Sequence, residues 1–201
     1  MSELSPATVA RLPRYLRLLE EFGGGETVSS DILAEAAGVT AANVRRDMAS
    51  LGFQGTRGVG YSSTHLAARI RRELGIEKRR QVGIVGAGNL GTALAGYSGL
   101  GRRGFDVTAV YDVDPRRIGQ KVAGIEIRDM RSLAGDLRDG VFDMAILAVP
   151  ASSAQTVADA LVMAGVRAML NFAPARIEVP SGVALRQVDL SHELQILSHY
   201  G

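Results

Sequence analysis

Three spaced glycines follow an apolar run near the middle of this 201-residue sequence: Val82-Gly83-Ile84-Val85-Gly86-Ala87-Gly88-Asn89-Leu90-Gly91. The apolar run predicts a strand, and the spacing G-x-G-x-x-G directly after it is typical of the strand-to-helix turn of dinucleotide-binding domains. Gly86 would permit the sharp bend, Gly88 the approach of a pyrophosphate, and Gly91 the packing of helix on strand. Amides at the helix N-terminus favour phosphate. The candidate cofactor-binding residues of this glycine loop are Gly86, Ala87, Gly88, Asn89, Leu90 and Gly91.

A carboxylate stands where the next predicted strand ends. Residues 107–111 form that apolar run, and Asp112 follows it, 26 residues after Gly86. A carboxylate in this place accepts hydrogen bonds from both hydroxyls of an adenosine ribose and repels a 2′-phosphate, which predicts NAD(H) rather than NADP(H). Arg116 and Arg117 lie close by. NADP(H), another adenine nucleotide and no nucleotide at all therefore stay open as alternatives.

Strand and helix patterns alternate through the second part of the chain. The predicted strands are residues 82–85, 107–111, 144–149 and 168–172. Their alternation with helical segments predicts an α/β fold, a Rossmann-like parallel sheet with helices on both faces. Ligands in this fold lie beyond the carboxyl ends of the strands. Two more strand ends therefore supply candidate nicotinamide contacts, Val149, Pro150, Asn171 and Phe172. A plain turn is an equal interpretation of Pro150.

The first part of the chain has helical rather than alternating patterns. Ser5 can cap a first helix that has Pro6 in its first turn. The apolar stripe of this helix consists of Leu12, Leu16 and Leu19. Pro13 lies inside the pattern and predicts a break into a short and a longer helix. The glycine run at residues 23–25 predicts the end of the second piece.

Two short helices joined by a tight turn come next. Ser29 or Ser30 can cap the first, and Gly38 can end it. Its predicted inward face consists of Ile32, Leu33 and Ala36. Thr40 can cap the second helix, whose predicted inward face consists of Val44, Met48 and Leu51. Such a pair is typical of the helix-turn-helix arrangement of DNA-binding proteins.

Basic side chains and glycines favour contact with DNA in this region. The inward face of the second short helix turns Arg45 and Arg46 outward. Four glycines within residues 52–61 frame two short extended segments, which predicts a β-hairpin, the wing of a winged helix. The wing would bring Arg57 to a neighbouring groove. The candidate DNA-binding residues are Arg45, Arg46, Arg57, Gly58, Gly60 and Tyr61. A solvated basic surface on a three-helix bundle is the alternative.

Composition excludes several classes of protein. The chain is 46% apolar and 22% charged, and it has no cysteine. Thiolate nucleophiles, Cys-based zinc sites and thiol redox switches are therefore excluded. No cluster has the spacing of a metal site, so we expect no metal. No apolar run approaches the roughly 20 residues of a membrane span, which predicts a cytoplasmic protein with no membrane partner.

A charged run marks a domain boundary. Residues 62–80 predict a linker helix that ends in Glu77-Lys78-Arg79-Arg80. The predicted domains are a winged-helix DNA-binding domain at 1–78, a Rossmann NAD(H)-binding domain at 79–186 and a dimerisation helix at 187–201. The apolar stripe of the last helix consists of Leu190, Leu194 and Leu197. It has to pack on its own domain or on a partner subunit, and a dimer suits a reader of paired DNA half-sites.

The sequence predicts no catalytic residue. A dehydrogenase needs a proton donor and a substrate pocket, usually supplied by a second domain after the nucleotide domain. Only 27 residues follow Pro174. The histidines are His65, His192 and His199. His192 is the one candidate acid, and a surface role is its default interpretation.

Motifs from both parts of the chain together resemble those of the Rex family of redox-sensing transcriptional repressors. The motifs are Arg57-Gly58-Val59-Gly60-Tyr61, the glycine loop, Tyr111-Asp112-Val113-Asp114-Pro115 and Asn171-Phe172-Ala173-Pro174. The resemblance covers essentially the whole chain. It implies a homodimer that binds operator DNA when NADH is low and leaves it when NADH replaces NAD+. It also implies a domain-swapped C-terminal helix that packs near the winged-helix domain of the partner subunit.

The resemblance also implies roles by position. It assigns Arg45, Arg46 and Arg57 to DNA. It assigns the glycine loop and Asp112 to the adenosine half of the cofactor, and Tyr97 to the nicotinamide side. Thr56 is a departure, because many members have a lysine there, and its absence removes a possible phosphate contact.

A hypothesis for the switch follows. NAD+ and NADH differ in the charge and planarity of one ring, so the switch has to sense that ring. We expect Tyr97 to contribute to the nicotinamide pocket, and Arg17 and Asp189 to form an ion pair in only one subunit arrangement. A solvated Arg17 and a helix-capping Asp189 are the alternatives. For the whole protein, a small NAD-dependent oxidoreductase and a regulator that answers to another ligand, such as a coenzyme A derivative, stay open.

Overall fold

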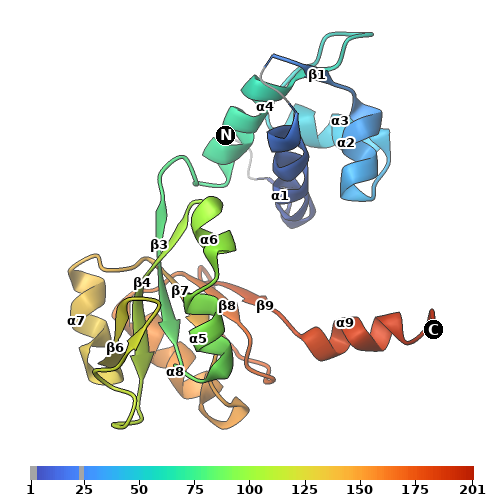
Figure 1. Ribbon diagram of the computed structural model, residues 1–201. Coiled ribbons are helices and arrows are strands. Elements are labelled where there is room, and N and C mark those ends of the chain that lie inside the picture. The colour runs from blue at the N-terminus through green and yellow to red at the C-terminus, as the bar shows by residue number, and fades with distance from the viewer. Residues whose placement is uncertain (1–3, 23–24) are drawn as a thin grey trace. The chain divides into compact units, whose positions relative to one another are not determined.

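The chain divides into two compact units, which we call the N-terminal unit, Met1–Lys78, and the C-terminal unit, Arg79–Gly201 (Figure 1). Their structure is a computed structural model that describes residues 4–22 and 25–201. The N-terminal unit is mainly helical, whereas the C-terminal unit is built around a seven-stranded sheet.

Helices dominate the described part of the N-terminal unit. The helices are α1 (Pro6–Glu21), α2 (Ser30–Ala37), α3 (Ala41–Ser50) and α4 (Ser63–Glu73). Two short strands, β1 (Thr27–Val28) and β2 (Tyr61–Ser62), pair antiparallel. All four helices contribute to one buried core, whose largest members are Leu12, Tyr15, Leu33, Met48, Leu51, Leu66 and Ile70. This arrangement is the expected winged helix-turn-helix.

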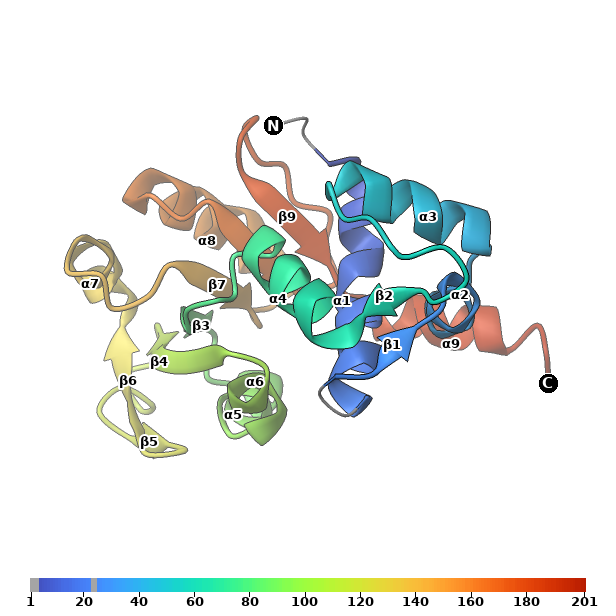
Figure 2. The same ribbon diagram turned by 90° about the horizontal axis from the view of Figure 1, so that it is seen from above.

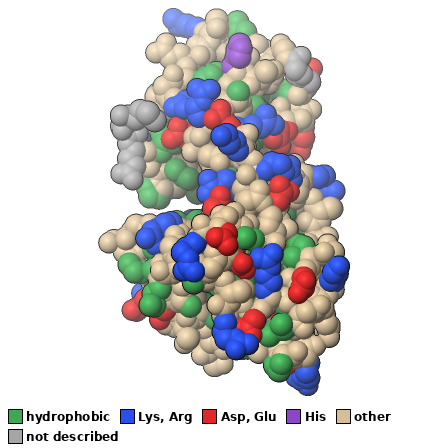
Figure 3. Space-filling view, turned by 90° about the vertical axis from the view of Figure 1, so that its left-hand side faces the viewer, with side chains coloured by type: hydrophobic (Ala, Val, Ile, Leu, Met, Phe, Trp, Pro, Cys, Tyr) green, Lys and Arg blue, Asp and Glu red, His purple; other side chains and the backbone are tan. Residues whose placement is uncertain are grey.

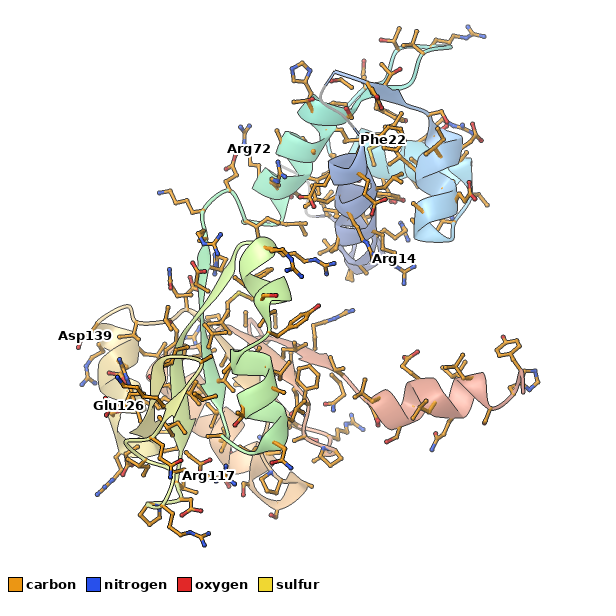
Figure 4. The ribbon with its side chains drawn as sticks, viewed as in Figure 1. Arg14, Phe22, Arg72, Arg117, Glu126 and Asp139 are labelled. Carbon is orange, nitrogen blue, oxygen red and sulfur yellow. The ribbon has the colours of Figure 1, made fainter. Side chains whose placement is uncertain are left out.

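Capping residues set the helix boundaries. The N-caps of α1, α2 and α3 are Ser5, Ser29 and Thr40, and each side chain accepts a hydrogen bond from the amide three residues on. Gly38 ends α2 with φ 67°, the left-handed conformation that favours glycine. Arg14 on α1, labelled in Figure 4, donates to the carbonyl of Ala37 at 2.9 Å. The predicted caps of these helices are confirmed.

Helix α1 continues through Pro13, so the predicted break is wrong. Pro13 is exposed, and its ring removes the hydrogen bond to the carbonyl of Val9, which is 42% exposed. Water can take that bond, while one continuous helix buries the whole apolar stripe. The helix ends at Glu21, and the predicted stop at residues 23–24 lies outside the described residues.

The buried face of α2 differs from the prediction. Leu33 is buried as expected, but Ile32 is 40% exposed and Ala36 is also exposed. Ala34 and Ala37 are buried in their place, because these small side chains face the neighbouring helices α1 and α3. In α3 the predicted inward residues are confirmed, since Val44, Met48 and Leu51 are all buried.

The sheet of the C-terminal unit has the strand order β5-β6-β4-β3-β7-β8-β9. Its strands are β3 (Arg80–Val85), β4 (Phe105–Asp112), β5 (Lys121–Val122), β6 (Ile125–Asp129), β7 (Met144–Leu147), β8 (Ala168–Asn171) and β9 (Ala184–Gln187). Neighbours pair in parallel, except for the β5–β6 hairpin at one edge (Figure 2). From β6 to β9 the order is that of a Rossmann sheet, which reverses at β3.

Helices cover both faces of this sheet. They are α5 (Asn89–Ala95), α6 (Ser98–Arg102), α7 (Leu133–Arg138) and α8 (Ala151–Ala164), with a 3₁₀ turn at Met130–Ser132. Val82 and Ile84 of β3 belong to a core shared with α5 and α6, whereas Val85 belongs to the core on the face covered by α7 and α8. The expected parallel sheet with helices on both faces is confirmed.

Several element boundaries differ from the expected ones. The linker helix ends at Glu73, and the strand predicted at 144–149 ends at Leu147. Strands β5, β6 and β9 have no counterpart in the prediction. The last helix, α9 (Leu190–Leu197), has no buried residue. Within residues 4–22 and 25–201, no helix is long and apolar enough to cross a membrane.

Candidate functional site

The glycine loop connects β3 to α5 and requires glycine at its first and last positions. Gly86 has φ 101°, which L side chains rarely adopt, and a Cβ there would overlap the carbonyl oxygen of Ala148. A Cβ at Gly91 would overlap the carbonyl oxygen of Gly86, because α5 passes directly over the loop. The sharp turn and the close packing that the spacing predicts are both present.

Gly88 is open to solvent rather than packed. Its φ is −70°, and no atom lies within 4 Å of a Cβ built on it. The packing of the protein therefore does not require glycine at this position. No side chain caps α5 at Gly88, so the amides of its first helical turn are left for a ligand. An open backbone surface at a helix start fits a pyrophosphate group.

Asp112 lies at the end of β4, against the glycine loop. Its Oδ2 accepts from the amide of Ala87 at 2.8 Å, and its Oδ1 accepts from the amides of Val113 and Asp114 at 2.7 and 2.9 Å. A carboxylate has about four acceptor sites, so about one is left. Asp112 therefore has room for one ribose hydroxyl in this arrangement, rather than for the two expected.

The two arginines near Asp112 are both engaged within the protein. Arg116 contacts Asp114 at 2.8 Å, and hydrogen bonds from its side chain and its amide lower the pKa of Asp114 to about 2. Arg117, labelled in Figure 4, donates to the carbonyl of Ala87 in the glycine loop. The cations that left NADP(H) open as an alternative thus already have partners.

The turn after β7 lies beside the glycine loop. A Cβ on Gly86 would meet the side chain of Val149 at 3.1 Å, and Pro150 stands exposed at the start of α8. The amide of Phe172 donates to the carbonyl of Leu147 at 2.9 Å, which holds the end of β8 next to that of β7. The structure therefore brings the predicted strand-end residues to the edge where the strand order reverses.

The side chain of Asn171 is enclosed rather than open to a ligand. It is 0% exposed, and its Oδ1 accepts from the amide of Ala173 at 2.9 Å. Its Nδ2 donates to the carbonyl of Ala175 at 3.1 Å and to Oε1 of Gln187 at 2.6 Å. Asn171 therefore shapes the loop after β8, and direct contact with a nicotinamide ring stays a prediction for half-buried Phe172.

Tyr97 stands between α5 and α6 with 56% of its surface exposed. Its ring lies against Gly99, where a Cβ would overlap it. The ring is thus held by a backbone contact while most of its surface is open. Its role beside the nicotinamide stays a prediction.

Exposed arginines mark the face of the N-terminal unit expected at DNA. On α3, Arg45 donates to Ser30 Oγ at 3.2 Å and Arg46 to Asn43 Oδ1 at 3.3 Å, and both are exposed. Within the part of the chain that the structure describes, neither they nor Arg57 has a carboxylate partner within 4.0 Å. Their charges are therefore available to phosphates.

The wing, residues 52–61, is a tight loop closed by reciprocal hydrogen bonds between Thr56 and Gly60 at 2.8 and 2.9 Å. The two strands expected there are reduced to this one bridge. With the start of α2 and Arg45, the wing borders a hollow of about 770 Å³. Tyr61 also lines this hollow, although it is only 7% exposed and packs with Phe53 in the core, and its contact with DNA stays a prediction.

A buried carboxylate that no sequence motif singles out lies on the inner side of α3. Asp47 is 2% exposed and accepts bonds from Arg11 at 2.7 Å, Tyr15 at 2.8 Å and Thr8 at 3.0 Å, all on α1. A signal was present, because Asp47 lies three residues after Val44 and next to Met48, on the inward face. These bonds fix α3 against α1.

Arg17 and Asp189, the ion pair expected in only one subunit arrangement and called the relay below, each have a local partner. Arg17 is 71% exposed and lies 3.7 Å from Glu21 on the same helix. Asp189 caps α9, where its Oδ1 accepts from the amides of Ser191 and His192 at 2.9 and 3.2 Å. The alternative roles, a solvated helix residue and a helix cap, therefore describe both residues here, and the Arg17–Asp189 pair stays a prediction.

Charge is mixed over the face shown in Figure 3, where acidic side chains lie among the basic ones. With a net charge of only +2, DNA binding has to rest on local arginines rather than on a general basic field. Among the described residues, no group of three or more His, Asp or Glu is placed to hold a metal ion.

Comparison with protein families matches both units. Residues 77–175 match the family described as "CoA binding domain", and residues 3–49 match "Putative DNA-binding protein N-terminus". A nucleotide-binding fold and a DNA-binding N-terminus are thus found in one chain, as the sequence predicts.

Named relatives extend over nearly the whole chain. The redox-sensing transcriptional repressor Rex of Streptomyces coelicolor is 50% identical over 96% of this chain and 76% of the relative. The Rex of Syntrophomonas wolfei is 44% identical over 98% of this chain and 95% of the relative. These relatives are named repressors and not enzymes.

Solved structures of a Rex-family repressor match the fold of the whole chain. The crystal structure of RSP, a Rex-family repressor, has a TM-score of 0.87 and 35% identity, and covers 100% of this chain and 94% of that chain. RSP in complex with beta-NAD+ and operator DNA has a TM-score of 0.90 and 37% identity, covering 100% and 93%. The fold, the two matched units and these relatives lead to one conclusion: the chain belongs to the Rex family of redox-sensing transcriptional repressors.

Proposed function

We propose that this protein represses transcription by binding operator DNA as a homodimer, and that NADH bound in the C-terminal unit releases it. The observation that carries the proposal is that one chain has both a winged helix and an open glycine loop at a Rossmann switch point. The winged helix carries exposed arginines that have no carboxylate partner among the described residues. RSP was solved in complex with beta-NAD+ and operator DNA, with 37% identity to this chain, and also in complex with beta-NADH, with 35% identity.

The glycine loop supports NAD(H) as the cofactor class. Gly88 leaves space for a pyrophosphate, and Asp112 would accept a ribose hydroxyl and repel a 2′-phosphate. Because Arg116 and Arg117 are engaged with Asp114 and Ala87, they do not offer a 2′-phosphate a ready site. When bound, the cofactor supplies a ring whose redox state the protein can sense.

The exposed apolar face of α9 supports the homodimer. Its large apolar side chains are 47 to 66% exposed and are Leu190, Leu194, Ile196 and Leu197. A helix of eight residues is marginal in water without packing of its apolar face. A second copy of the chain would cover that face, and operator half-sites would then follow its two-fold symmetry.

One selection experiment tests the function. Purified protein is used to select from random DNA duplexes without nucleotide at fixed salt, and the bound pool is then challenged separately with NADH, NAD+, NADPH and coenzyme A. We expect a palindromic site that NADH releases at far lower concentration than the other three. If no DNA is recovered under any condition and the protein oxidises NADH with a carbonyl substrate, the repressor proposal is wrong and the protein is an oxidoreductase.

The wing arginine gives a first mutational prediction. Arg57→Ala is expected to weaken operator binding by about tenfold and to lower the slope of log affinity against log salt by about 1, since one phosphate contact is lost. Thr56→Lys is expected to raise that slope by about 1. Fluorescence anisotropy at several salt concentrations measures both. Lys121→Ala, on β5 of the other unit, is the control, and equal slopes for all four proteins would contradict a phosphate role of the wing.

The relay gives a second prediction. Asp189→Asn retains a good N-cap but removes the charge, and Arg17→Ala removes the proposed partner. Each is expected to leave operator and NADH affinities unchanged but to raise the NADH concentration for half-release by about tenfold, which is about 1.4 kcal/mol of coupling. Glu21→Ala removes the local partner of Arg17 and is expected to behave as wild type. Release at the wild-type concentration in both relay variants would reject the relay.

A further inference from the structure

Two side-chain amides join the loop after β8 to the strand that leads into α9. Asn171, at the end of β8, donates to Oε1 of Gln187 at 2.6 Å, and Gln187, at the end of β9, donates from Nε2 to the carbonyl of Ala173 at 2.9 Å. The amide of Ala173 returns a bond to Oδ1 of Asn171 at 2.9 Å. These three residues form a closed ring of hydrogen bonds, which we call the amide clamp.

The amide clamp lies between two segments with different tasks. On one side, Phe172 and Ala173 stand at the carboxyl edge of the sheet, where the nicotinamide end of a bound nucleotide is expected. On the other side, the amide of Val188 donates to the carbonyl of Asn171 at 2.9 Å, and the next residue, Asp189, caps α9. Only Val188 separates Gln187 from Asp189, the cap of α9. A shift of the loop after β8 would therefore also move the start of α9.

A hollow beside the amide clamp gives both segments room to move. It measures about 380 Å³, and its lining includes Arg176 and Ile177 of the loop, Leu185 and Gln187 of β9, and Asp189 at the start of α9. The loop and the helix cap thus face the same space rather than a packed wall. Backbone pairing joins β8 to β9 up to Asn171 and Gln187, and the amide clamp adds side-chain bonds that reach past the strand end to Ala173 of the loop.

We propose that the amide clamp couples the redox state of the bound nucleotide to α9, with Gln187 as its positioning residue. The inference rests on the proposed function. A ligand shifts an equilibrium only through different interactions with the two states. NADH and NAD+ can differ in their fit against the loop at residues 172–174, and the clamp turns the preferred position of that loop into a preferred position of α9.

The same loop holds a matched control. Gln155 on α8 donates from Nε2 to the carbonyl of Glu178 at 2.9 Å, and its Oε1 accepts from the amide of Glu178 at 2.9 Å. This pair has the same amide chemistry and holds the same loop, but it ties the loop to α8. Among the described residues, the side chain of Gln155 bonds to Asp159 and Glu178 and to no residue of β9 or α9. If any loosening of the loop disturbed the switch, loss of Gln155 would do so as well.

The experiment compares Gln187→Leu and Gln155→Leu in the full chain by two independent measurements. Calorimetry gives the affinity for NADH without DNA, and fluorescence anisotropy gives the NADH concentration that half-releases a selected operator. For Gln187→Leu we expect NADH and operator affinities within threefold of wild type but a release concentration at least tenfold higher. For Gln155→Leu we expect all three values to match wild type.

A measurement of stability and a second variant distinguish uncoupling from a loss of folding. Gln187 is exposed, so its replacement should leave the melting temperature near that of wild type. Gln187→Glu can still accept from Asn171 but sets a carboxylate against the carbonyl of Ala173, and it should uncouple release in the same way.

Two results would overturn the amide clamp. The first is that Gln187→Leu releases the operator at the same NADH concentration as wild type, with the same NADH affinity. The second is that Gln155→Leu raises the release concentration as much as Gln187→Leu does. Failure of the proposed function itself is separate, because wild-type protein would then bind NADH without leaving the operator, and the clamp would be rejected with it.

Discussion

Asp47→Ala is expected to lower the free energy of unfolding of the N-terminal unit by about 3–5 kcal/mol, the cost of removing one partner of a buried ion pair. Asp47 is 2% exposed, and its removal leaves the Arg11 guanidinium and the Tyr15 hydroxyl without their acceptor. A domain is stable by only about 5–15 kcal/mol. Urea unfolding of the full chain, followed by circular dichroism, measures the loss.

A graded control separates the charge from the hydrogen bonds. Thr8→Val removes one neutral donor to Asp47 and is expected to cost about 1 kcal/mol. Operator affinity should fall with the first variant more than with the second, because Asp47 fixes the helix that carries Arg45 and Arg46. Equal losses of stability in Asp47→Ala and Thr8→Val would show that the buried charge is not what holds α1 and α3 together.

The same carboxylate predicts a pH dependence. Burial alone raises the pKa of Asp47, but hydrogen bonds from Arg11, Tyr15 and Thr8 outweigh it and leave the pKa below its usual value. A group with a lowered folded pKa stabilises the fold fully above its unfolded pKa, about 4, and loses that contribution as pH falls through the folded pKa. The stability difference between wild type and Asp47→Ala should therefore close on acidification below about pH 4.

Gly91→Ala is expected to weaken NADH binding by at least about 100-fold, or about 2.8 kcal/mol. The added Cβ would overlap the carbonyl oxygen of Gly86, so α5 has to move away from the turn that sets the phosphate-facing amides. The neighbouring atom is backbone and cannot rotate aside, which means that the melting temperature should fall as well. Calorimetric titration with NADH and a thermal melt of the same sample provide both values.

Gly88→Ala is the matched control for steric cause. Nothing lies within 4 Å of its added Cβ, so the protein should melt as wild type does. The new methyl group nevertheless enters the space assigned to the pyrophosphate, and NADH binding should weaken without any loss of stability. Wild-type affinity in Gly88→Ala would place the pyrophosphate elsewhere.

Local signals explain why much of the fold could be predicted. The caps Ser5, Ser29 and Thr40 and the stop at Gly38 act through hydrogen bonds within a few residues of themselves, so the sequence displays them directly. The glycine loop is also local, because its turn and its close packing depend on residues five positions apart. These elements and the Rossmann-like fold are confirmed.

What could not be predicted depends on partners distant in the chain. Asp47 meets Thr8, 39 residues away, and Asn171 meets Gln187, 16 residues away. Strand β5 has two residues, too few for a periodic pattern, and β9 has the sequence Ala-Leu-Arg-Gln, which is mostly exposed and has no apolar run. The burial of Tyr61 also depends on a distant residue, because it pairs with Val28 of β1 against the core.

The boundary between Lys78 and Arg79 also orders events on the ribosome. The N-terminal unit has all its described elements within the first 78 residues, whereas β3 cannot pair with β7 until Met144 has been made. At about 5–20 residues per second, those 66 further residues take about 3–13 s. Each nascent chain therefore carries the described elements of the N-terminal unit for several seconds before the central strands of the C-terminal sheet can pair.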